Sequence, residues 1–410
     1  MTIYSAPELS SPRLSRRAYA ALLTGQFGQG LTLSMLSAVL PQIAAYFGGG
    51  AGGEMIAQQM ATFPFLGLTA GGLLSGPIIK RLGLRPTVLV AASLFAASGA
   101  VPIVTATALP MLVAAFVLGL CASLLTSAIS GVAGEVLVGE PLAKLVGYQV
   151  ALGIIGSGGL GFLAALASQS FGWRAPFAGY VITGTVILAL NLAGLPNVPL
   201  RGGESGAAGS LIRAVWTIYL LGFLTFIVVT LVPTYMPFFM AERGIFSAAT
   251  RSGLLTVVPV AVFLGSMVFP QIQGRLPAWA ATALPTAFLS IAFLLLANWT
   301  GPVWQMALAL TLAGLGIGLI IPSLFTSTLA RAPHAGAQAI GFLNASIFAG
   351  SFVTPYLLST PRQQLGIAGM LWGMCFAILA VGIIVLLVAR RNDSVSEETT
   401  TSIAPAGRAL

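Results

Sequence analysis

Residues 55–107 read MIAQQMATFPFLGLTAGGLLSGPIIKRLGLRPTVLVAASLFAASGAVPIVTAT. This stretch contains two long apolar runs, 55–79 and 87–107, which are separated by a short basic segment. A helix needs about 20 mostly apolar residues to cross the hydrocarbon core of a bilayer, and both runs are long enough. The stretch therefore predicts two membrane-spanning helices joined by a tight basic loop.

The whole chain has the composition of a membrane protein. Of its 410 residues, 57% are hydrophobic and only 7% are charged, and the mean hydropathy is +0.98. A soluble domain has about 25% charged residues, and so few charges would not cover its surface. The composition thus excludes a soluble enzyme, a nucleic-acid-binding protein and a disordered chain.

Apolar runs of spanning length recur along the chain. Twelve of them can be drawn, at 18–47, 55–79, 87–107, 111–133, 145–169, 175–195, 214–239, 250–273, 279–297, 303–329, 336–359 and 366–390. Membrane barrels instead show short segments of alternating polarity, so we expect helices and no strands. The sequence predicts an all-α membrane protein with twelve transmembrane helices.

A polar segment at 196–213 divides the twelve runs into two sets of six and is typical of a flexible linker. The two halves resemble each other at equivalent positions: Pro64 corresponds to Pro259, and Lys80 corresponds to Arg275. Such correspondence is expected if the halves are parallel repeats. The expected parts are an N-terminal tail 1–17, a six-helix bundle 18–195, the linker, a six-helix bundle 214–390 and a tail 391–410.

The basic residues predict the orientation in the membrane. With both termini in the cytoplasm, only four of the 18 Lys and Arg residues fall on the outer side, Arg174, Arg243, Arg251 and Arg362. Basic residues are enriched in cytoplasmic loops, so this asymmetry favours cytoplasmic termini. The net charge of +9 is explained by this topology and requires no nucleic-acid partner. We expect a multi-pass plasma membrane protein, in the inner membrane if the source is bacterial.

The basic loop GPIIKRLGLRP resembles the signature G-x-x-x-D-R-x-G-R-[RK], which joins the second and third helices in the major facilitator superfamily. Gly76, Arg81, Gly83 and Arg85 match the signature, whereas Lys80 replaces its Asp. The Gly-Trp-Arg at 172–174 resembles the start of the sixth helix in the same family. The resemblance implies two six-helix bundles around a central site and transport by alternating access.

The resemblance also bears on the direction of transport. Gly147 and Gly156 match part of a glycine motif of the family's antiporters, so export is preferred. Ala115 stands where many proton-coupled members have Arg, which leaves an uptake permease or facilitator as the alternative. A membrane sensor on a transporter scaffold is a more remote alternative.

Neutral polar side chains inside the apolar runs are the candidates for substrate binding. Such a group either contacts a ligand or joins two helices by a hydrogen bond. The candidates are Gln26, Gln29, Thr126, Tyr219, Thr230 and Asn344. The middle third of each run lacks ionisable Asp, Glu, Lys, Arg and His, so we expect a small neutral or amphipathic organic substrate.

The charged residues at the ends of the runs are candidates for coupling and gating. They are Glu54, Lys80, Arg81, Arg85 and Glu135. Glu54 is either a solvated residue at a helix end or a proton carrier. The family resemblance implies that Glu135 pairs with Arg85 or Arg81 at the inner mouth.

The sequence predicts no enzyme activity, cofactor or metal site, because one His and nine acidic residues offer no catalytic cluster. Cys121 and Cys375 lie in apolar runs and are expected to be small buried side chains without a disulfide. The expected partners are a small-molecule substrate, membrane lipid and a proton as coupling ion, and the chain is expected to be a monomer.

Overall fold

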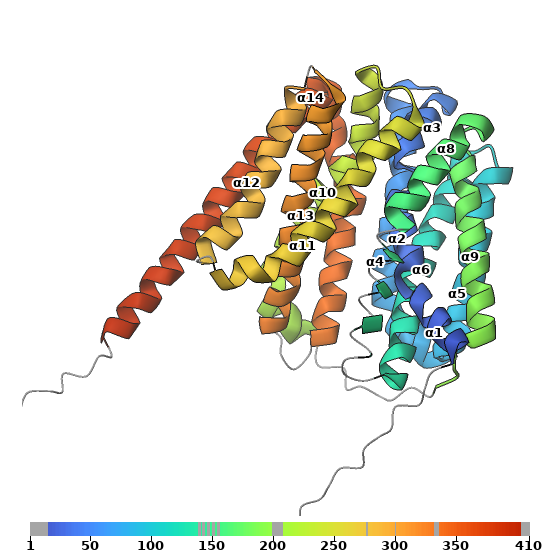
Figure 1. Cartoon of the computed structure of the whole chain (residues 1–410), viewed down its shortest axis with the longest axis horizontal. Coiled ribbons are helices and arrows are strands. Elements are labelled where there is room, and N and C mark those ends of the chain that lie inside the picture. The colour runs from blue at the N-terminus through green and yellow to red at the C-terminus, as the bar shows by residue number, and fades with distance from the viewer. Residues whose placement is uncertain are drawn as a thin grey trace, which may run out of the picture. The chain divides into compact units, whose positions relative to one another are not determined.

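The computed structural model describes residues 15–137, 141, 144, 145, 148, 149, 152, 153, 156–198, 208–275, 278–299, 301–331 and 336–402. Every regular element in these segments is helical (Figure 1), which confirms the all-α prediction. Residues 1–14 of the predicted N-terminal tail and 199–207 of the predicted linker lie outside the described residues.

The helices follow the apolar runs closely. They are α1 (Arg16–Leu23), η1 (Thr24–Gln26), α2 (Phe27–Ser34), η2 (Ser37–Val39), α3 (Leu40–Tyr46), α4 (Gly50–Leu82), α5 (Leu84–Val104), α6 (Ala108–Val136), η3 (Gly156–Leu160), α8 (Gly161–Phe171), α9 (Ala175–Gly194), α10 (Ala208–Glu242), α11 (Ala248–Arg275), α12 (Ala278–Ala297), α13 (Val303–Arg331) and α14 (Gly336–Ser402). Here η1 and η2 are 3₁₀ turns and η3 is a π-helical turn.

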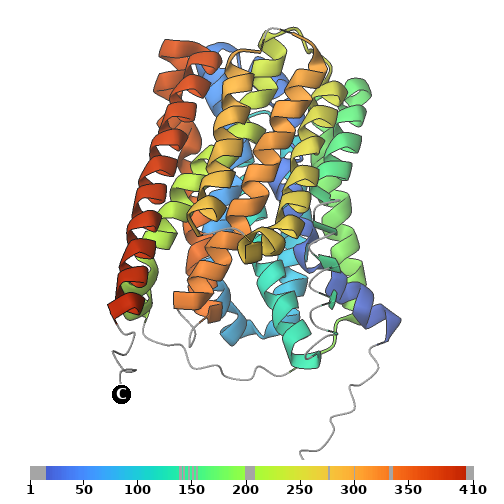
Figure 2. The same cartoon turned by 60° about the vertical axis from the view of Figure 1, so that its left-hand side comes forward.

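The predicted count of twelve spanning helices is not confirmed. Eight helices in the described segments are long and apolar enough to cross a membrane, and Ala283–Ala297 is apolar but shorter. The first run, 18–47, is broken by the two 3₁₀ turns, and the run at 145–169 lies partly outside the described residues. The last two runs form two helices, which share the label α14 and meet at a kink where Gly366 has non-helical backbone angles (φ 69°, ψ 178°). The second of these helices, coloured red, can be followed in Figure 2.

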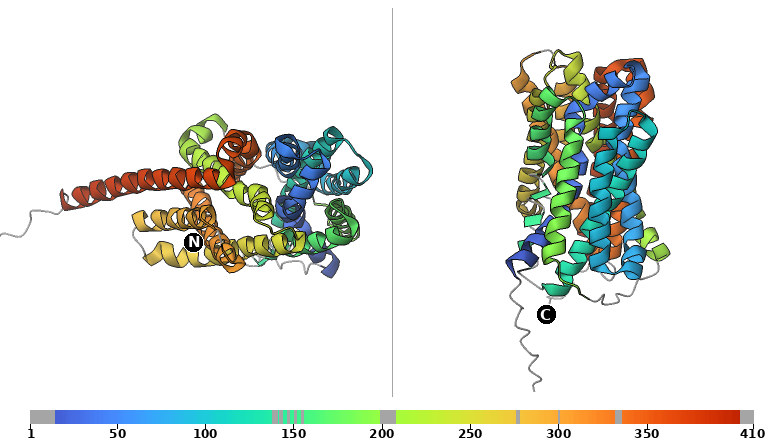
Figure 3. Two further views of the ribbon diagram at one scale, coloured as in Figure 1. Left: turned by 90° about the horizontal axis from the view of Figure 1, so that it is seen from above. Right: turned by 90° about the vertical axis from the view of Figure 1, so that its right-hand side faces the viewer.

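The described chain forms two compact units. The first extends to Ser252 and includes Thr328–Pro355, and the second comprises Gly253–Ser327 and the chain from Tyr356 onward. The boundary differs from the predicted linker, and the division into halves 18–195 and 214–390 stays a prediction. In the first unit, α6 packs against α4 and α5, and α5 packs against α9 (Figure 3).

Glycines allow the closest helix contacts in each unit. In the first unit, a Cβ at Gly119 of α6 would collide with the Pro64 carbonyl of α4. In the second unit, a Cβ at Gly265 of α11 would lie 2.7 Å from the Leu315 oxygen of α13, and Ser266 Oγ donates to the Gly318 oxygen at 2.9 Å. Small residues of this kind are typical of helix pairs in membranes, where close backbone packing replaces the hydrophobic effect.

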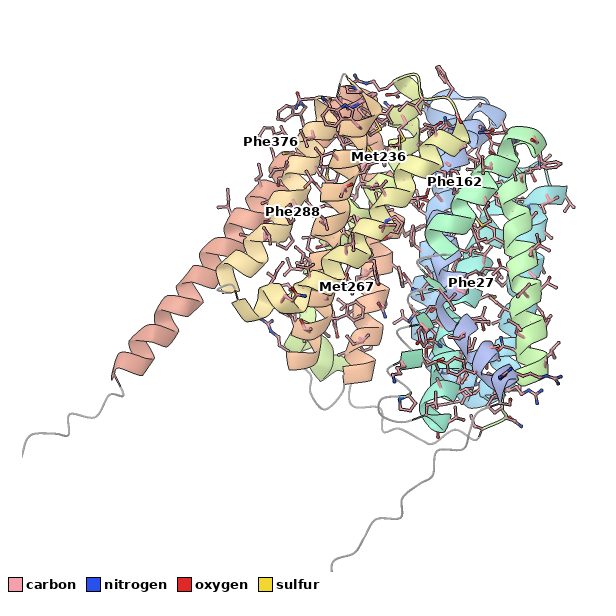
Figure 4. All side chains as sticks on the ribbon, in the orientation of Figure 1. Phe27, Phe162, Met236, Met267, Phe288 and Phe376 are labelled. Carbon is pink, nitrogen blue, oxygen red and sulfur yellow. The ribbon has the colours of Figure 1, made fainter. Side chains whose placement is uncertain are left out.

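Large apolar side chains also cover outward faces of the helices (Figure 4). Met267 of α11 is 59% exposed and Phe376 of α14 is 61% exposed. Such surfaces are unfavourable in water and favourable in a bilayer. Together with the eight spanning helices, they identify a multi-pass membrane protein.

Candidate functional site

The first apolar run is interrupted at the turn η1. Three glycines within residues 25–30 weaken the helix there, because glycine loses much conformational freedom on ordering. Gln26 adopts φ −106° and ψ −3°, which departs from α-helical geometry. A break of this kind frees main-chain carbonyls from the helical ladder, so that side chains or a ligand must satisfy them.

Thr126 of α6 reaches into this break. Its Oγ1 lies 2.8 Å from the Gly25 carbonyl oxygen, 3.2 Å from Gln29 Oε1 and 3.0 Å from the Ala122 carbonyl oxygen of its own helix. A hydroxyl has one proton to donate, so these three acceptors share it. The structure thus brings together two of the predicted substrate-binding residues, Gln29 and Thr126.

Two buried amides that sequence reasoning missed complete the surroundings of η1. Gln149 Nε2 donates to the Leu22 carbonyl at 2.6 Å, and Asn191 Nδ2 donates to Thr24 Oγ1 at 3.0 Å. Asn191 Oδ1 is buried and has no hydrogen-bond partner among the described residues. Both residues lie near the ends of predicted runs, where a polar side chain is ordinary, so only their burial reveals them.

Gln26 is the least constrained member of this group. Its side chain is half-buried and makes no hydrogen bond with the described residues, although it lies at the break itself. Its amide therefore keeps both donor and acceptor capacity for another molecule. We call the set around η1 the polar cluster, which consists of Thr24, Gln26, Gln29, Thr126, Gln149 and Asn191.

Tyr219 and Thr230 lie on α10 and bind the neighbouring α14. Tyr219 Oη donates to the Ala339 carbonyl at 3.1 Å, and Thr230 Oγ1 donates to Ser351 Oγ at 2.7 Å. Both side chains are buried, and these bonds join two helices. Their polar atoms already serve helix packing, and contact with a substrate stays a prediction for both.

Asn344 is the last predicted substrate-binding residue. It lies on α14 between the two contacts of that helix with α10, and it is half-buried. Its side-chain amide makes no hydrogen bond with the described residues, so it resembles Gln26 in having free hydrogen-bonding capacity.

The predicted coupling residues lie at helix ends. Glu54 Oε1 accepts from Gln58 Nε2 at 3.1 Å in the first part of α4, and Glu135 is half-buried in the last turn of α6. Lys80 and Arg81 are exposed in the last turn of α4. Cations are favourable at that end of a helix.

Arg85 of α5 is held by a main-chain group. Its Nη2 donates to the Leu192 carbonyl at 3.3 Å, and its Nε is buried without a hydrogen-bond partner among the described residues. This contact joins α5 to the end of α9. The pairing of Glu135 with Arg85 or Arg81 stays a prediction.

Arg174, from the Gly-Trp-Arg segment, fastens the other end of the first unit. Its guanidinium donates to the carbonyls of Pro102 and Thr105 and to Tyr46 Oη, each at 3.2 Å, and stacks over Trp173 at 4.2 Å. The carbonyls at the end of α5 thereby gain the donors that the helix cannot supply. The motif has a structural role here.

The described residues contain no group of three or more His, Cys, Asp or Glu side chains that could hold a metal ion. Cys121 and Cys375 are buried free thiols, as the sequence predicts. What the first unit offers chemically is a set of neutral hydrogen-bonding groups at a broken helix.

Comparison with known proteins agrees with this architecture. The family model of the Major Facilitator Superfamily matches residues 22–355. The multidrug resistance protein MdtM of Escherichia coli (strain K12) is 26% identical in an alignment 285 residues long, which covers 63% of this chain and 68% of MdtM. The ectoine/proline transporter ProP of Corynebacterium glutamicum is 25% identical in an alignment 268 residues long, which covers 57% of this chain and 51% of ProP.

Solved structures show the same fold at low sequence identity. A crystal structure of a mutant of the peptide transporter POT, in complex with alafosfalin, superposes with a TM-score of 0.73 at 15% identity, covering 92% of this chain and 94% of that chain. A D-xylose-proton symporter superposes with a TM-score of 0.66 at 16% identity, covering 91% of this chain and 95% of that chain.

Proposed function

The chain belongs to the major facilitator superfamily, and we propose that it moves a small neutral or amphipathic organic molecule across the membrane by alternating access. The family and its relatives make the chain a transporter and not an enzyme. The nature of the substrate, the direction and the mechanism are the proposal.

The polar cluster is the observation that carries the proposal. Its side chains are amides and hydroxyls, and the amide of Gln26, at a break in the first run, makes no hydrogen bond with the described residues. Ligand sites typically combine much apolar surface with a few polar groups that fix the orientation of the ligand. An ionised substrate would need a countercharge when it leaves water, and the cluster supplies none. Neutral or amphipathic molecules fit such surroundings best.

Export is our preferred direction. The relative MdtM is described as a multidrug resistance protein, which supports efflux of amphipathic molecules. Uptake is the second candidate, since the relative ProP is described as an ectoine/proline transporter. The proton is the coupling ion that we propose, because one neighbour of the same fold is a D-xylose-proton symporter and Glu54 and Glu135 are carboxylates at helix ends.

The proposal includes two six-helix halves, 18–195 and 214–390, that rock about the site with both termini in the cytoplasm. Parallel six-helix repeats support such motion in transporters of this architecture.

Flux through proteoliposomes tests the proposed function. The purified chain is reconstituted, and the release of three dyes of similar size is followed: ethidium as a cation, fluorescein as an anion and a neutral dye. We expect protein-dependent flux that favours the neutral dye and depends only weakly on charge. Strict selection of a multiply charged molecule would contradict the neutral site.

A matched pair of variants locates the site. Gln29→Leu removes an amide of the polar cluster, and Gln305→Leu removes an exposed amide at the start of α13. We expect slower flux in the first variant and unchanged flux in the second. Equal rates would place the substrate elsewhere.

A further inference from the structure

Arg251 is almost fully buried, with 2% of its surface exposed, although the sequence places it among the basic residues of the outer side. It lies in the first turn of α11 and belongs to the first compact unit. A buried guanidinium is costly unless its N–H groups find acceptors. Its partners therefore indicate what the residue does.

Two of the four hydrogen bonds of Arg251 are local. Its Nη1 donates to the carbonyls of Ile245 and Phe246 at 3.0 and 2.8 Å, in the turn that leads from α10 into α11. These bonds hold the guanidinium against its own segment of chain. They do not depend on any other part of the molecule.

The other two bonds reach across the fold. Nε and Nη2 both donate to the Ala38 carbonyl, at 3.1 and 2.8 Å, which is 213 residues away in the sequence. Ala38 lies in the 3₁₀ turn η2, where a carbonyl would pair with the N–H three residues later. That position is Pro41, which has no N–H, so the sequence itself leaves this acceptor for Arg251.

Further contacts join α10 and the turn into α11 to other helices of the first unit. The helix α10 packs against η2, α3 and α4. Near the turn into α11, Gln169 Nε2 donates to Ser247 Oγ at 3.2 Å. By the predicted topology this is the outer end, so Arg251 sits within the contact that would close the outer mouth.

We propose that Arg251 is an outer latch, by which we mean a contact that holds the outer mouth closed. Its Nε and Nη2 donate to the Ala38 carbonyl when the outer mouth is closed, and these hydrogen bonds break when the mouth opens. This inference rests on the proposed alternating access. On release, the Nη1 bonds keep the side chain on the α11 segment, and η2 moves away.

The chemistry of the partners suits a reversible contact. Among the described residues, Arg251 bonds only to main-chain carbonyls and to no carboxylate. The bonds lost on opening are offset by hydration of a cation that was buried, so the two states can lie close in free energy. If Arg251 were instead paired with a buried carboxylate, opening would separate two charges, and both would have to be hydrated.

Cysteine labelling tests the latch without any substrate. Ser37 is buried beside Ala38 in η2, so Ser37→Cys reports opening through its reaction rate with a maleimide. The native thiols Cys121 and Cys375 are buried and set the background. The full-length protein is labelled in detergent, with the parent and each variant compared at equal concentration.

We expect Arg251→Gln to raise the labelling rate of Ser37→Cys by about tenfold or more, the change that loss of a hydrogen bond to a charged group produces. Arg251→Lys keeps the positive charge but loses the forked pair of guanidinium N–H donors, and it should raise the labelling rate less. The matched control is Arg243→Gln, which removes an exposed charge from the same turn and should leave the rate unchanged. Equal rates in Arg251→Gln and Arg243→Gln would overturn the latch.

Two further variants separate opening from general loosening. Thr87→Cys reports a buried position at the start of α5, and its labelling should not change with Arg251→Gln. If both cysteines react faster, the residue is only structural and the latch is wrong. If Arg251→Gln does not fold, Pro41→Ala decides, because it supplies an N–H that competes for the Ala38 carbonyl; an unchanged Ser37→Cys rate there refutes the latch.

Labelling and flux test the latch and the proposed function independently. A change in the labelling rate without dye flux would support the latch and refute the transport proposal. Dye flux without a change in the labelling rate would support transport and refute the latch.

Discussion

Gly119 shows how strictly single residues determine the packing of the first unit. A Cβ at this position of α6 would overlap the main chain of α4 at Pro64. Backbone atoms cannot turn aside as a flexible side chain can, so the two helices would have to separate. Overpacking of this kind costs about 1–3 kcal/mol in well-packed cores.

We therefore expect Gly119→Ala to lower the free energy of unfolding by about 1–3 kcal/mol, measured as a drop in thermal stability in detergent. The control is Gly134→Ala on the same helix, where a Cβ meets nothing within 4 Å. That variant should be neutral or stabilising by up to about 1 kcal/mol, because alanine restricts the unfolded chain. Equal losses in the two variants would contradict the close approach.

Thr126 carries the prediction for the polar cluster. Thr126→Val keeps the shape but removes the hydroxyl that Gly25 and Gln29 share. A net hydrogen bond is worth about 0.5–1.5 kcal/mol, so the dye concentration for half-maximal flux should rise about two- to tenfold. Thr185→Val is the control, because Thr185 is exposed on α9 and its hydroxyl donates to the Val181 carbonyl of its own helix at 2.8 Å. An unchanged concentration dependence in Thr126→Val would remove the cluster from the site.

Sequence reasoning found part of the cluster and not the rest. Gln29 and Thr126 stand out in the sequence as polar residues inside apolar runs, and the structure shows that they are in contact. Gln149, Asn191 and Arg251 stand near run ends, where polarity has an ordinary explanation. Their burial depends on helices far away in the sequence, which hydropathy does not encode.

At the scale of elements, the apolar runs predict where helices lie but not where they break. Glycines at 25–30 and Pro41 mark the two 3₁₀ turns in the first run, yet such residues also occur inside intact helices, as Pro64 does in α4. Tertiary partners decide between these outcomes: Thr126 satisfies the break at η1, and Arg251 satisfies the one at η2. The positions of the helix breaks therefore could not be predicted from the sequence and are known from the structure.

The helix-end carboxylates carry the prediction for coupling. With no ionisable residue in the middle of a run, a proton carrier must sit at an end, and Glu54 and Glu135 are the candidates. We expect Glu54→Gln combined with Glu135→Gln to abolish accumulation driven by a pH gradient, while exchange at equal pH persists. Each single variant shows which carboxylate is responsible.

Glu242→Gln is the control for coupling, because Glu242 is an exposed carboxylate at the end of α10. It should retain full pH-driven accumulation. Full accumulation in the double variant would exclude both candidates as proton carriers.

At the scale of the whole molecule, the distribution of basic residues predicts that both termini face the cytoplasm. Arg13→Cys, which lies outside the described residues, and Ser396→Cys should resist a membrane-impermeant maleimide in intact cells and react after permeabilisation. An outer-loop control, Thr107→Cys, should react in intact cells. Labelling of both terminal cysteines from outside would reverse the orientation.

The membrane class follows directly from the composition, because a chain with so few charged residues is not suited to a surface in water. Helical content follows because a helix satisfies its own backbone hydrogen-bonding groups inside a bilayer. The count of twelve spans does not follow in the same way, since the first run is broken by two 3₁₀ turns and the run at 145–169 lies partly outside the described residues. The basic loop and the Gly-Trp-Arg at 172–174 together predict the superfamily that the comparison shows, although Lys80 stands in place of Asp.

Solute counterflow distinguishes a carrier that works by alternating access from an open pathway. Proteoliposomes containing the purified chain are loaded with an excess of unlabelled transported dye and diluted into a trace of labelled dye. Alternating access exchanges one molecule for another, so labelled dye should accumulate transiently above its outside concentration and then decline. Monotonic equilibration without an overshoot would show an open pathway or no carrier, and would contradict the account.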